Sequence, residues 1–361
     1  MSQRAIPCVF MRGGTSRGPF FKASDLPSDP ALRDQVLLRV MGSPDSRQID
    51  GIGGATTVTS KVAIVSHSDH PEADIDYLFA QVDIERPIVD TGPTCGNMLS
   101  GIAPFAIEEG LFPAQNGQTT VRIHNVNTNS IIKATIQTPN REVYYEGDCA
   151  IHGVPGTGSP ILLQFFQIEG SKTGKLLPTG NVRDEIEGVE VTCIDVAMPM
   201  VIARADAFGK TGYETRAELN ADKGFIERFE HIRRIAGQKM GLGDVRDSVI
   251  PKFAIVAPPR RDGHFTSRYF TPWTCHQTYA VSGSMCISSC AALPGSIVAS
   301  VLQRDERFPQ LSRIEHPLGT IDVKLELNTK NGQFEVISAG VLRTARRLFA
   351  GDVYVPSSVW K

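Results

Sequence analysis

The stretch Gly92-Pro93-Thr94-Cys95-Gly96-Asn97-Met98 runs into the apolar segment 99–111 and predicts a sharp, glycine-bracketed turn that delivers Cys95 to a helix. The first turn of a helix has unpaired backbone N–H groups and the positive end of the helix dipole, which favour anions. These surroundings also favour the thiolate form of a cysteine, which suits Cys95 to proton transfer or nucleophilic attack. The alternative is a structural Cys95, because free cysteines are often small buried hydrophobic residues.

A second stretch, Ser282-Gly283-Ser284-Met285, repeats the pattern of Cys95-Gly96-Asn97-Met98. Each stretch is followed by small and apolar residues that suit a buried helix. The repetition predicts two similar half-domains that present two helix N-termini to one central cleft, where a substrate with more than one carboxylate would bind. The match is short, and a chance similarity is the alternative.

The composition is that of a soluble globular protein. The 361 residues favour two domains, and 41% hydrophobic and 21% charged residues are ordinary values. The formal net charge of −2 gives no reason to expect a nucleic-acid partner. No apolar run is long enough to span a membrane, and Met1–Phe10 lacks a signal-peptide core. The seven scattered cysteines without a C-x-x-C pair indicate reduced thiols, a cytoplasmic protein and no structural zinc site.

Alternating and β-branched segments predict many short strands punctuated by glycine and proline. The predicted strands are Lys61–Ser66, Tyr77–Glu85, Thr119–Val126, Ser130–Thr138, Ile161–Phe166, Val189–Asp195, Pro199–Ala203, Phe253–Ala257 and Thr320–Leu327, with a hairpin turn at Asn331-Gly332. The predicted helices are one that is capped by Asp29-Pro30 and closed by Gly42, then Leu99–Gly110, Asn220–Gly237, and one after Ser284 through Cys286–Leu293. The fold class is therefore α+β, with mostly antiparallel sheets around few helices.

Two glycine-rich loops are candidates for binding. Met11–Gly18 is rich in backbone donors, and Arg12 or Arg17 suits a carboxylate or phosphate, unless the loop is a tight turn with solvated arginines. Gly42–Gly54 lacks the spacing of a dinucleotide-binding fingerprint, which excludes a Rossmann-type site. Because long ordered loops often build binding sites, we expect this loop to form the wall of a pocket.

Two titratable residues outside these loops have both a structural and a functional interpretation. Lys61 opens an apolar strand and is either a solvated strand end or, in a cleft beside Arg12 and Arg17, a neutral general base. His276 either binds substrate or completes the core. Cys275, Cys286 and Cys290 are interpreted as packing residues.

Together these segments resemble the methylaconitate isomerase and 4-oxalomesaconate tautomerase (isomerase) family, and the resemblance covers nearly the whole chain. It rests on Met11–Gly18, Gly42–Asp45, Gln48–Gly54, Ser60–Ala63, Cys95–Asn97, Leu177–Gly180, Val191–Asp195, Met198-Pro199, Glu315–Pro317 and Val341–Arg346. The resemblance implies a diaminopimelate epimerase-like fold of two pseudo-symmetric α+β domains, each with a barrel-like, mostly antiparallel sheet around a central helix. The expected domains are residues 1–182 and 183–361, with a C-terminal segment that can cross back to the first domain, and the active site lies between them.

The resemblance also implies cofactor-independent proton transfer on an unsaturated di- or tricarboxylate, with no metal. Epimerases of this fold use two facing cysteines. Here the first matches Cys95 and the second position is Ser282, which fits the isomerase branch. Lys61 is expected as the base, and Cys95 as the second acid/base or as an orienting group. The expected substrate-binding residues are Arg12, Gly13, Gly14, Thr15, Ser16, Ser43, Gln48, Gly53, Ser60, Gly96, Asn97, His276, Ser282, Gly283, Ser284 and Met285.

The substrate is the least determined feature of the sequence. Ser46-Arg47-Gln48 and Asn127-Thr128 look closer to the 4-oxalomesaconate branch, which serves the catabolism of gallate- and protocatechuate-like acids. The alternatives are a methylaconitate, methylitaconate or aconitate isomerase, and a non-catalytic carboxylate-binding protein that kept the fold. Gly92-Pro93-Thr94 departs from the pattern expected in either branch. A homodimer is compatible with the sequence.

Overall fold

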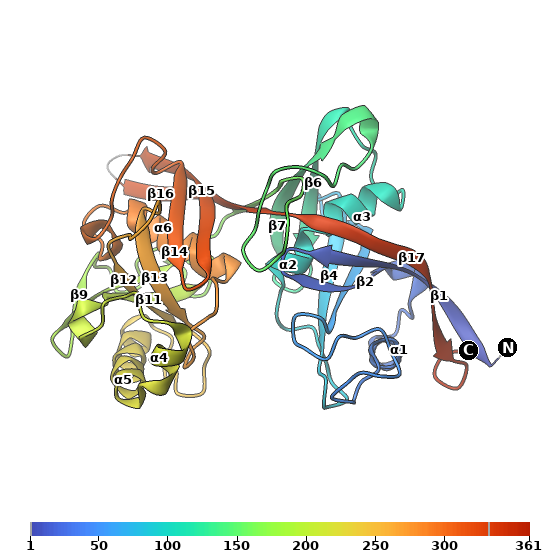
Figure 1. Cartoon of the computed structure of the whole chain (residues 1–361), viewed down its shortest axis with the longest axis horizontal. Helices are drawn as coiled ribbons and strands as arrows, with labels where there is room; N and C mark the ends of the chain where they lie inside the picture. The colour runs from blue at the N-terminus through green and yellow to red at the C-terminus, as the bar shows by residue number, and fades with distance from the viewer. Residues whose placement is uncertain (1, 331–332) are drawn as a thin grey trace. The chain divides into compact units, whose positions relative to one another are not determined.

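The computed structural model describes residues 2–330 and 333–361, so the hairpin turn predicted at Asn331-Gly332 lies outside the described residues. The chain forms two compact units (Figure 1). Unit 1 is Met1–Gln164 together with Leu342–Lys361, and unit 2 is Phe165–Val341. The boundary lies between residues 164 and 165, inside a strand, whereas the sequence predicts it after residue 182.

Unit 1 combines a mixed sheet with short helices. Its elements are β1 (Gln3–Gly13), β2 (Ser16–Lys22), η1 (Ala23–Asp25), α1 (Pro30–Met41), β3 (Lys61–His67), β4 (Ile75–Val82), β5 (Val89–Asp90), α2 (Gly96–Leu99), α3 (Ile102–Glu108), β6 (Gly117–Asn125), β7 (Ser130–Thr138), η2 (Pro139–Arg141), β8 (Ile161–Phe166, which continues into unit 2) and β17 (Ala345–Pro356). β1 pairs antiparallel with β2 and with β17. β2 and β3 are parallel, β3 and β4 antiparallel, and β4 and β6 parallel.

The helices of unit 1 cover opposite faces of its sheet. Val36 and Leu37 of α1 pack with Val62 and Ile64 of β3 in one core cluster. The side chains that alternate with these on the strands point to the other face of the sheet, which α2 and α3 cover. There the ring of Phe20 lies 5.8 Å from the ring of Phe105. The α2–α3 face carries the candidate site.

The predicted first helix is confirmed at both ends. Asp29 caps α1 by accepting a hydrogen bond from the Leu32 N–H at 2.9 Å, and Pro30 occupies the first position, where no N–H is needed. Gly42 ends the helix with a φ of 76°, a left-handed conformation that favours glycine.

The predicted helix Leu99–Gly110 is wrong as a single element. The chain forms the four-residue α2, turns at Ser100-Gly101, and continues as α3. Pro104 explains the break, because it has no N–H to donate to the carbonyl of Ser100 four residues earlier. A β-carbon at Gly101 would lie 2.6 Å from the Phe20 ring, so the turn packs directly on β2. Cys95 therefore precedes a single helical turn, which is a weaker anion site than a long helix.

Unit 2 has its own sheet and helices. Its elements are β9 (Asp184–Ile186), β10 (Val189–Asp195), β11 (Pro199–Arg204), η3 (Asp206–Phe208), α4 (Arg216–Ala221), α5 (Lys223–Lys239), β12 (Lys252–Ala257), β13 (Phe265–Phe270), α6 (Val281–Ala292), η4 (Val298–Ser300), β14 (Leu311–His316), β15 (Gly319–Lys330) and β16 (Gln333–Arg343, which continues into unit 1). The α+β prediction is confirmed, although parallel pairs interrupt the antiparallel sheets.

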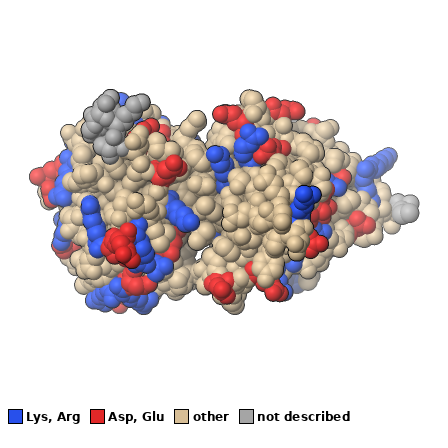
Figure 2. Space-filling view, turned by 90° about the horizontal axis from the view of Figure 1, so that it is seen from above, with Lys and Arg blue, Asp and Glu red and all other residues tan. Residues whose placement is uncertain are grey.

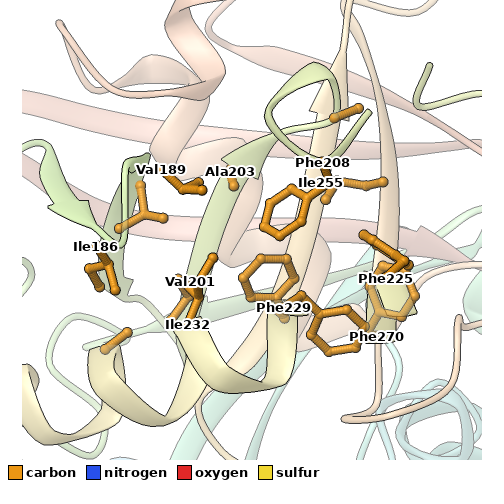
Figure 3. Packing of buried hydrophobic residues seen from close by; sticks show 14 of the residues in the cluster. Ile186, Val189, Val201, Ala203, Phe208, Phe225, Phe229, Ile232, Ile255 and Phe270 are labelled. Carbon is orange, nitrogen blue, oxygen red and sulfur yellow. The ribbon is translucent and has the colours of Figure 1, made fainter. Parts of the chain in front are cut away.

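The core of unit 2 lies between α5 and the sheet. Figure 3 shows Phe229 and Ile232 of α5 pointing toward Val201 of β11 and Ile255 of β12. The predicted helix Asn220–Gly237 is two helices, because the backbone of Asp222 is non-helical, with φ −85° and ψ 88°. Its side chain then caps α5 by accepting from the Phe225 N–H at 2.9 Å.

The predicted helix after Ser284 begins earlier, at Val281. Ser282 and Gly283 thus lie in its first turn, and the N-cap residue Ala280 makes no side-chain capping hydrogen bond. On the face drawn in Figure 2, acidic and basic side chains of the described residues are interspersed. No helix of the described chain is long and apolar enough to cross a membrane. All seven cysteines lie in described parts of the chain and are free thiols.

Candidate active site

Lys61 is the first residue of β3 and is partly buried on the α2–α3 face. Its Nζ donates to Oε1 of Gln81 at 2.6 Å and lies 4.9 Å from the centroid of the Phe79 ring. Nε2 of Gln81 in turn donates to the carbonyl of Ser60 at 2.7 Å, which fixes the orientation of the amide. An amide oxygen accepts from an ammonium or from an amine, so this contact orients Nζ in both protonation states.

Cys95 lies on the same face of the sheet as Lys61. In the β3–β4 pair, Lys61 is opposite Gln81 and Val65 is opposite Tyr77, and directly opposite residues share a face. The hydroxyl of Tyr77 donates to the carbonyl of Cys95 at 3.3 Å. Burial, with Cys95 alongside, raises the pKa of Tyr77 well above its ordinary value, so this tyrosine stays a neutral donor. The buried hydroxyl therefore anchors the backbone that carries the thiol.

The Met11–Gly18 segment is a hairpin rather than an open loop. β1 and β2 are joined by Gly14-Thr15, and Gly13 is paired with Ser16. Nδ2 of Asn97 donates to Oγ1 of Thr15 at 2.9 Å, which fastens the turn to the start of α2. The hairpin and the Cys95–Asn97 segment, both predicted as site residues, are therefore brought together.

Close backbone contact brings the hairpin next to Lys61. Gly18 is in register with Lys61 by extension of the parallel β2–β3 pairing. A β-carbon at Gly18 would lie 1.8 Å from the carbonyl oxygen of Lys61, so only glycine fits there. The hairpin and the amine thus belong to one assembly within unit 1.

The expected neighbourhood of Lys61, Arg12 and Arg17 is wrong. Arg12 and Arg17 are opposite each other in the β1–β2 pair. Because side chains alternate along a strand, both point to the face of the sheet that is opposite to the face of Gly18 and Lys61. Nη1 of Arg12 donates to the carbonyls of Gly14 and Thr344, at 2.8 and 2.9 Å. Arg12 therefore supports the hairpin turn, and Arg17 is exposed beside Phe10.

We expect Gly14→Ala to weaken both the fold and the catalysis. Gly14 has a φ of 51°, and an added β-carbon would lie 2.2 Å from Oδ1 of Asn97. Backbone strain and this clash should together lower the free energy of unfolding by about 2–3 kcal/mol in urea denaturation. Gly110→Ala is the matched control, because Gly110 also has a positive φ, of 74°, but nothing within 4 Å of an added β-carbon. Equal losses in the two variants would contradict the close packing of the turn on Asn97.

The second glycine-rich loop is held together by a buried glutamine. Nε2 of Gln48 donates to Oγ of Ser43 at 3.0 Å and to Oγ of Ser60 at 2.7 Å. Oε1 of Gln48 accepts from the Ala55 N–H at 2.8 Å, and a β-carbon at Gly53 would lie 2.2 Å from the same atom. Gln48, Ser43 and Ser60 are buried and bonded to one another. These contacts favour a supporting role over direct contact with substrate for the three residues and for Gly53, all four of which are predicted site residues.

Two asparagines hold the backbone on either side of the approach to Cys95; the sequence marks Asn127 only as a sign of the substrate branch and does not mark Asn125. Asn127 donates from Nδ2 to the carbonyls of Phe79 and Thr91, at 2.8 and 2.7 Å, and its Oδ1 accepts from the Phe79 N–H. Asn125 donates from Nδ2 to Oγ1 of Thr94 at 2.5 Å. The alternation of Tyr77, Phe79 and Gln81 was a readable signal for one strand face. Their juxtaposition with the asparagines depends on pairings that no local pattern reveals.

A pocket of about 490 Å³ in unit 1 has Gln81 in its lining. Its lining includes Asp83, Glu85, Arg86 and Asp90. Arg86 is paired with Asp83 at 2.6 Å, so the remaining lining is acidic and disfavours a polycarboxylate. Lys61 and Cys95 are not part of this lining, and they remain the candidate catalytic residues. Among the described residues, no group of three His, Cys, Asp or Glu side chains could hold a metal ion.

The predicted residues of unit 2 gather around the start of α6. Nδ1 of His276 accepts from the Thr278 N–H at 3.1 Å, and burial with nearby Arg216 and Lys252 lowers the pKa of His276. Ser282 is partly exposed, whereas Ser284 and Met285 are buried. The Ser284 N–H and hydroxyl donate to the carbonyls of Ala280 and Val281, both at 2.8 Å. Ser282 and Gly283 lie in the first turn of α6, where backbone N–H groups have no carbonyl partner within the helix.

Known proteins are similar to this chain over nearly its whole length. A family model described as "PrpF protein" matches residues 3–356. The "Putative isomerase YbhH" of Escherichia coli strain K12 is 50% identical over 353 residues, covering 98% of this chain and 100% of that protein. The "4-oxalomesaconate tautomerase" of Pseudomonas putida is 44% identical over 362 residues, covering 100% of this chain and 99% of that protein.

Solved structures share the fold. The crystal structure of a methylitaconate-delta-isomerase has a TM-score of 0.91 and 40% identity, covering 99% of this chain and 97% of that chain. A hydroxyproline epimerase and a probable proline racemase share the fold at low identity. The predicted epimerase-like α+β fold is confirmed.

Proposed function

The chain belongs to the PrpF family and is an isomerase, and from this premise we propose that it shifts a proton and a double bond within 4-oxalomesaconate, an unsaturated tricarboxylic keto acid. The observation that carries the proposal is the placement of Lys61 and Cys95 on one sheet face, with the amine oriented by the neutral amide of Gln81. The 44% identity to a 4-oxalomesaconate tautomerase over the full chain supports this substrate.

The reaction begins with the removal of a carbon-bound proton. The neutral amine of Lys61 takes the proton, and the electron pair of the broken C–H bond spreads into the conjugated keto and carboxyl groups as a dienolate. Reprotonation at another position moves the double bond, so the reaction has no net loss or gain of atoms. Donors that are already oriented stabilise the developing charge without reorganisation.

Cys95 is the proposed second acid/base. Its thiol supplies the proton that returns to the dienolate, unless the ammonium of Lys61 returns the proton itself and Cys95 only orients the substrate. The N–H groups of Gly96 and Asn97, with Thr15 and Ser16 of the hairpin, are the proposed carboxylate ligands in unit 1. Ser282 and Gly283 are the proposed ligands in unit 2, and His276 stays a candidate there.

The second candidate is a methylitaconate or methylaconitate isomerase, which the 40% identity to a methylitaconate isomerase structure favours. Both reactions need a base that removes a carbon-bound proton, and they differ in the acid that is isomerised and in the atom that receives the proton, which is oxygen if the first reaction is a keto–enol tautomerisation. For the first candidate we propose a role in the cytoplasmic catabolism of gallate- or protocatechuate-like acids, an environment that suits seven free thiols.

A panel of substrates tests the proposal. Purified protein is incubated separately with 4-oxalomesaconate, methylaconitate, methylitaconate and aconitate, and products are followed by NMR. We expect kcat/KM to be largest for 4-oxalomesaconate. A larger value for one of the other acids would transfer the assignment to that substrate, and no turnover of any would contradict the catalytic proposal.

A further inference from the structure

The two units are built on the same order of elements. In unit 1, the β1–β2 hairpin is followed by α1, a β3 strand parallel to β2, and a β4 strand antiparallel to β3. In unit 2, the β10–β11 hairpin is followed by α4 and α5, a β12 strand parallel to β11, and a β13 strand antiparallel to β12. In each unit a helical segment follows, and then a further parallel strand. In unit 1 this strand is β6, which is parallel to β4, and in unit 2 it is β14, which is parallel to β13. Equivalent positions can therefore be read from the strand registers.

Lys252 occupies the position of Lys61 in this repeat. Lys61 is the first residue of β3, two residues before Ala63, which is opposite Phe79. Lys252 is the first residue of β12, two residues before Ala254, which is opposite the aromatic Tyr269. Both lysines lie at the start of a strand that runs parallel to the second strand of a hairpin.

Lys252 shares a face of the sheet with the start of α6. Because side chains alternate along β12, Lys252 lies on the same face of the sheet as Ala254 and its pairing partner Tyr269. Phe253 points to the other face, which packs on α5. A β-carbon at Gly283 of α6 would lie 2.8 Å from the Tyr269 ring. The rings of Tyr269 and His276 are 6.0 Å apart. Lys252, His276 and the first turn of α6 are thus grouped within unit 2.

Lys252 is the cation of this group, and the described residues of the group include no carboxylate. Burial, with Arg233 nearby, lowers the pKa of Lys252 to about 8, and burial, with Arg216 and Lys252 nearby, lowers the pKa of His276. The described residues provide no ion pair for Lys252, whereas Arg233 is neutralised by Glu230 at 2.6 Å. A partly buried ammonium without a counter-charge is a binding point for an anion.

A buried arginine fixes the segment that leads to Lys252. Arg233 is fully buried, and its guanidinium donates to the carbonyls of Val245, Ser248 and Pro251 at 2.8 to 3.2 Å. Pro251 directly precedes Lys252. The start of β12 is therefore held rigidly, as a positioned binding group requires.

We propose that Lys252 is a substrate-binding residue whose ammonium binds a carboxylate of the polycarboxylate substrate. The inference rests on the proposed function, and it adds to the proposed carboxylate ligands of unit 2 a residue that the sequence did not mark. The charged and titratable groups around Lys252 are Arg233 on α5, His276 after β13, and Arg216 on α4 beyond His276.

The kinetic test uses Lys252→Met, Lys252→Arg and the exposed control Lys239→Met, which lies at the end of α5. We expect Lys252→Met to raise KM about 10- to 100-fold with kcat changed only a few-fold, because a charge-assisted contact is lost. Lys252→Arg should restore most of the affinity, and Lys239→Met should match the wild type. The wild-type KM should rise as the pH passes about 8, where Lys252 loses its proton, and Lys252→Arg should remove this rise. An unchanged KM in Lys252→Met would overturn the proposal, as would a loss confined to kcat.

A binding measurement separates this inference from the proposed function. Aconitate, a tricarboxylate, is titrated calorimetrically into the wild type, Lys61→Met and Lys252→Met. Binding that survives in Lys61→Met and is lost in Lys252→Met supports the carboxylate role of Lys252, even if the wild type turns over none of the panel. Equal binding in the wild type and Lys252→Met overturns the inference while leaving the proposed reaction intact. No wild-type binding of aconitate or of the other panel acids overturns both.

Discussion

Lys61→Met is expected to fold like the wild type and to lose about 10³- to 10⁴-fold in kcat, the range that a positioned general base contributes. Methionine keeps the length and the apolar contact of the side chain with the Phe79 ring, but it cannot accept a proton. The substitution also removes the donor to Gln81, whose Nε2 still has the Ser60 carbonyl as its acceptor. The loss should therefore appear in the rate and not in the fold, which kcat measurements and circular dichroism check.

Lys22→Met is the matched control for this prediction. Lys22 is in β2, in register with Val65, four residues along β3 from Lys61. At about 3.3 Å per strand residue the two positions are about 13 Å apart along the sheet. The control should keep wild-type kcat. Substantial activity in Lys61→Met would show that another group removes the proton.

Cys95→Ser is expected to lower kcat about 10²- to 10³-fold, because an aliphatic hydroxyl is a much weaker acid than a thiol. The backbone of Cys95 stays anchored by Tyr77 and by the Leu99 N–H, so the substitution changes one atom in a fixed place. If the thiol returns the proton, Lys61 still removes it. The variant should then exchange the substrate's C–H with solvent deuterium while forming little product.

The same measurement distinguishes the two roles of Cys95. Parallel losses of exchange and product formation would mean that the thiol only orients the substrate. Cys8→Ser is the control, since Cys8 is a buried thiol of β1 in the cluster that packs on α1. We expect it to retain wild-type kcat.

Local chemistry made much of the fold readable. Asp29, Pro30 and Gly42 predicted the ends of α1, because caps act through the nearest residues. Pro104 is the local signal for the break in the predicted Leu99–Gly110 helix, but the apolar pattern continues through it. β1 and β2 were not predicted because Pro7, Gly18 and Pro19 obscure the alternation, and because β1 pairs with the distant β17.

The candidate site residues could be named from motifs, whereas their contacts could not be predicted. Lys61 and Cys95 were identified from motifs, and the register that places them on one sheet face involves Tyr77 and Gln81, which no motif marked. The predicted place of Arg12 beside Lys61 was wrong because no motif gives the strand register, and a shift of one residue along a strand moves a side chain to the opposite face of the sheet. Lys252 became visible only when the strand registers of the two units were compared.

The most direct test of the account is isomerisation in D₂O. The wild-type protein is incubated with 4-oxalomesaconate, and the recovered substrate and product are examined by NMR for deuterium at carbon. The account predicts product that carries solvent deuterium at the reprotonated position, and no such product with Lys61→Met. Ligand-induced stabilisation of the wild type without any deuterium at carbon would contradict it and would indicate a carboxylate-binding protein without catalysis.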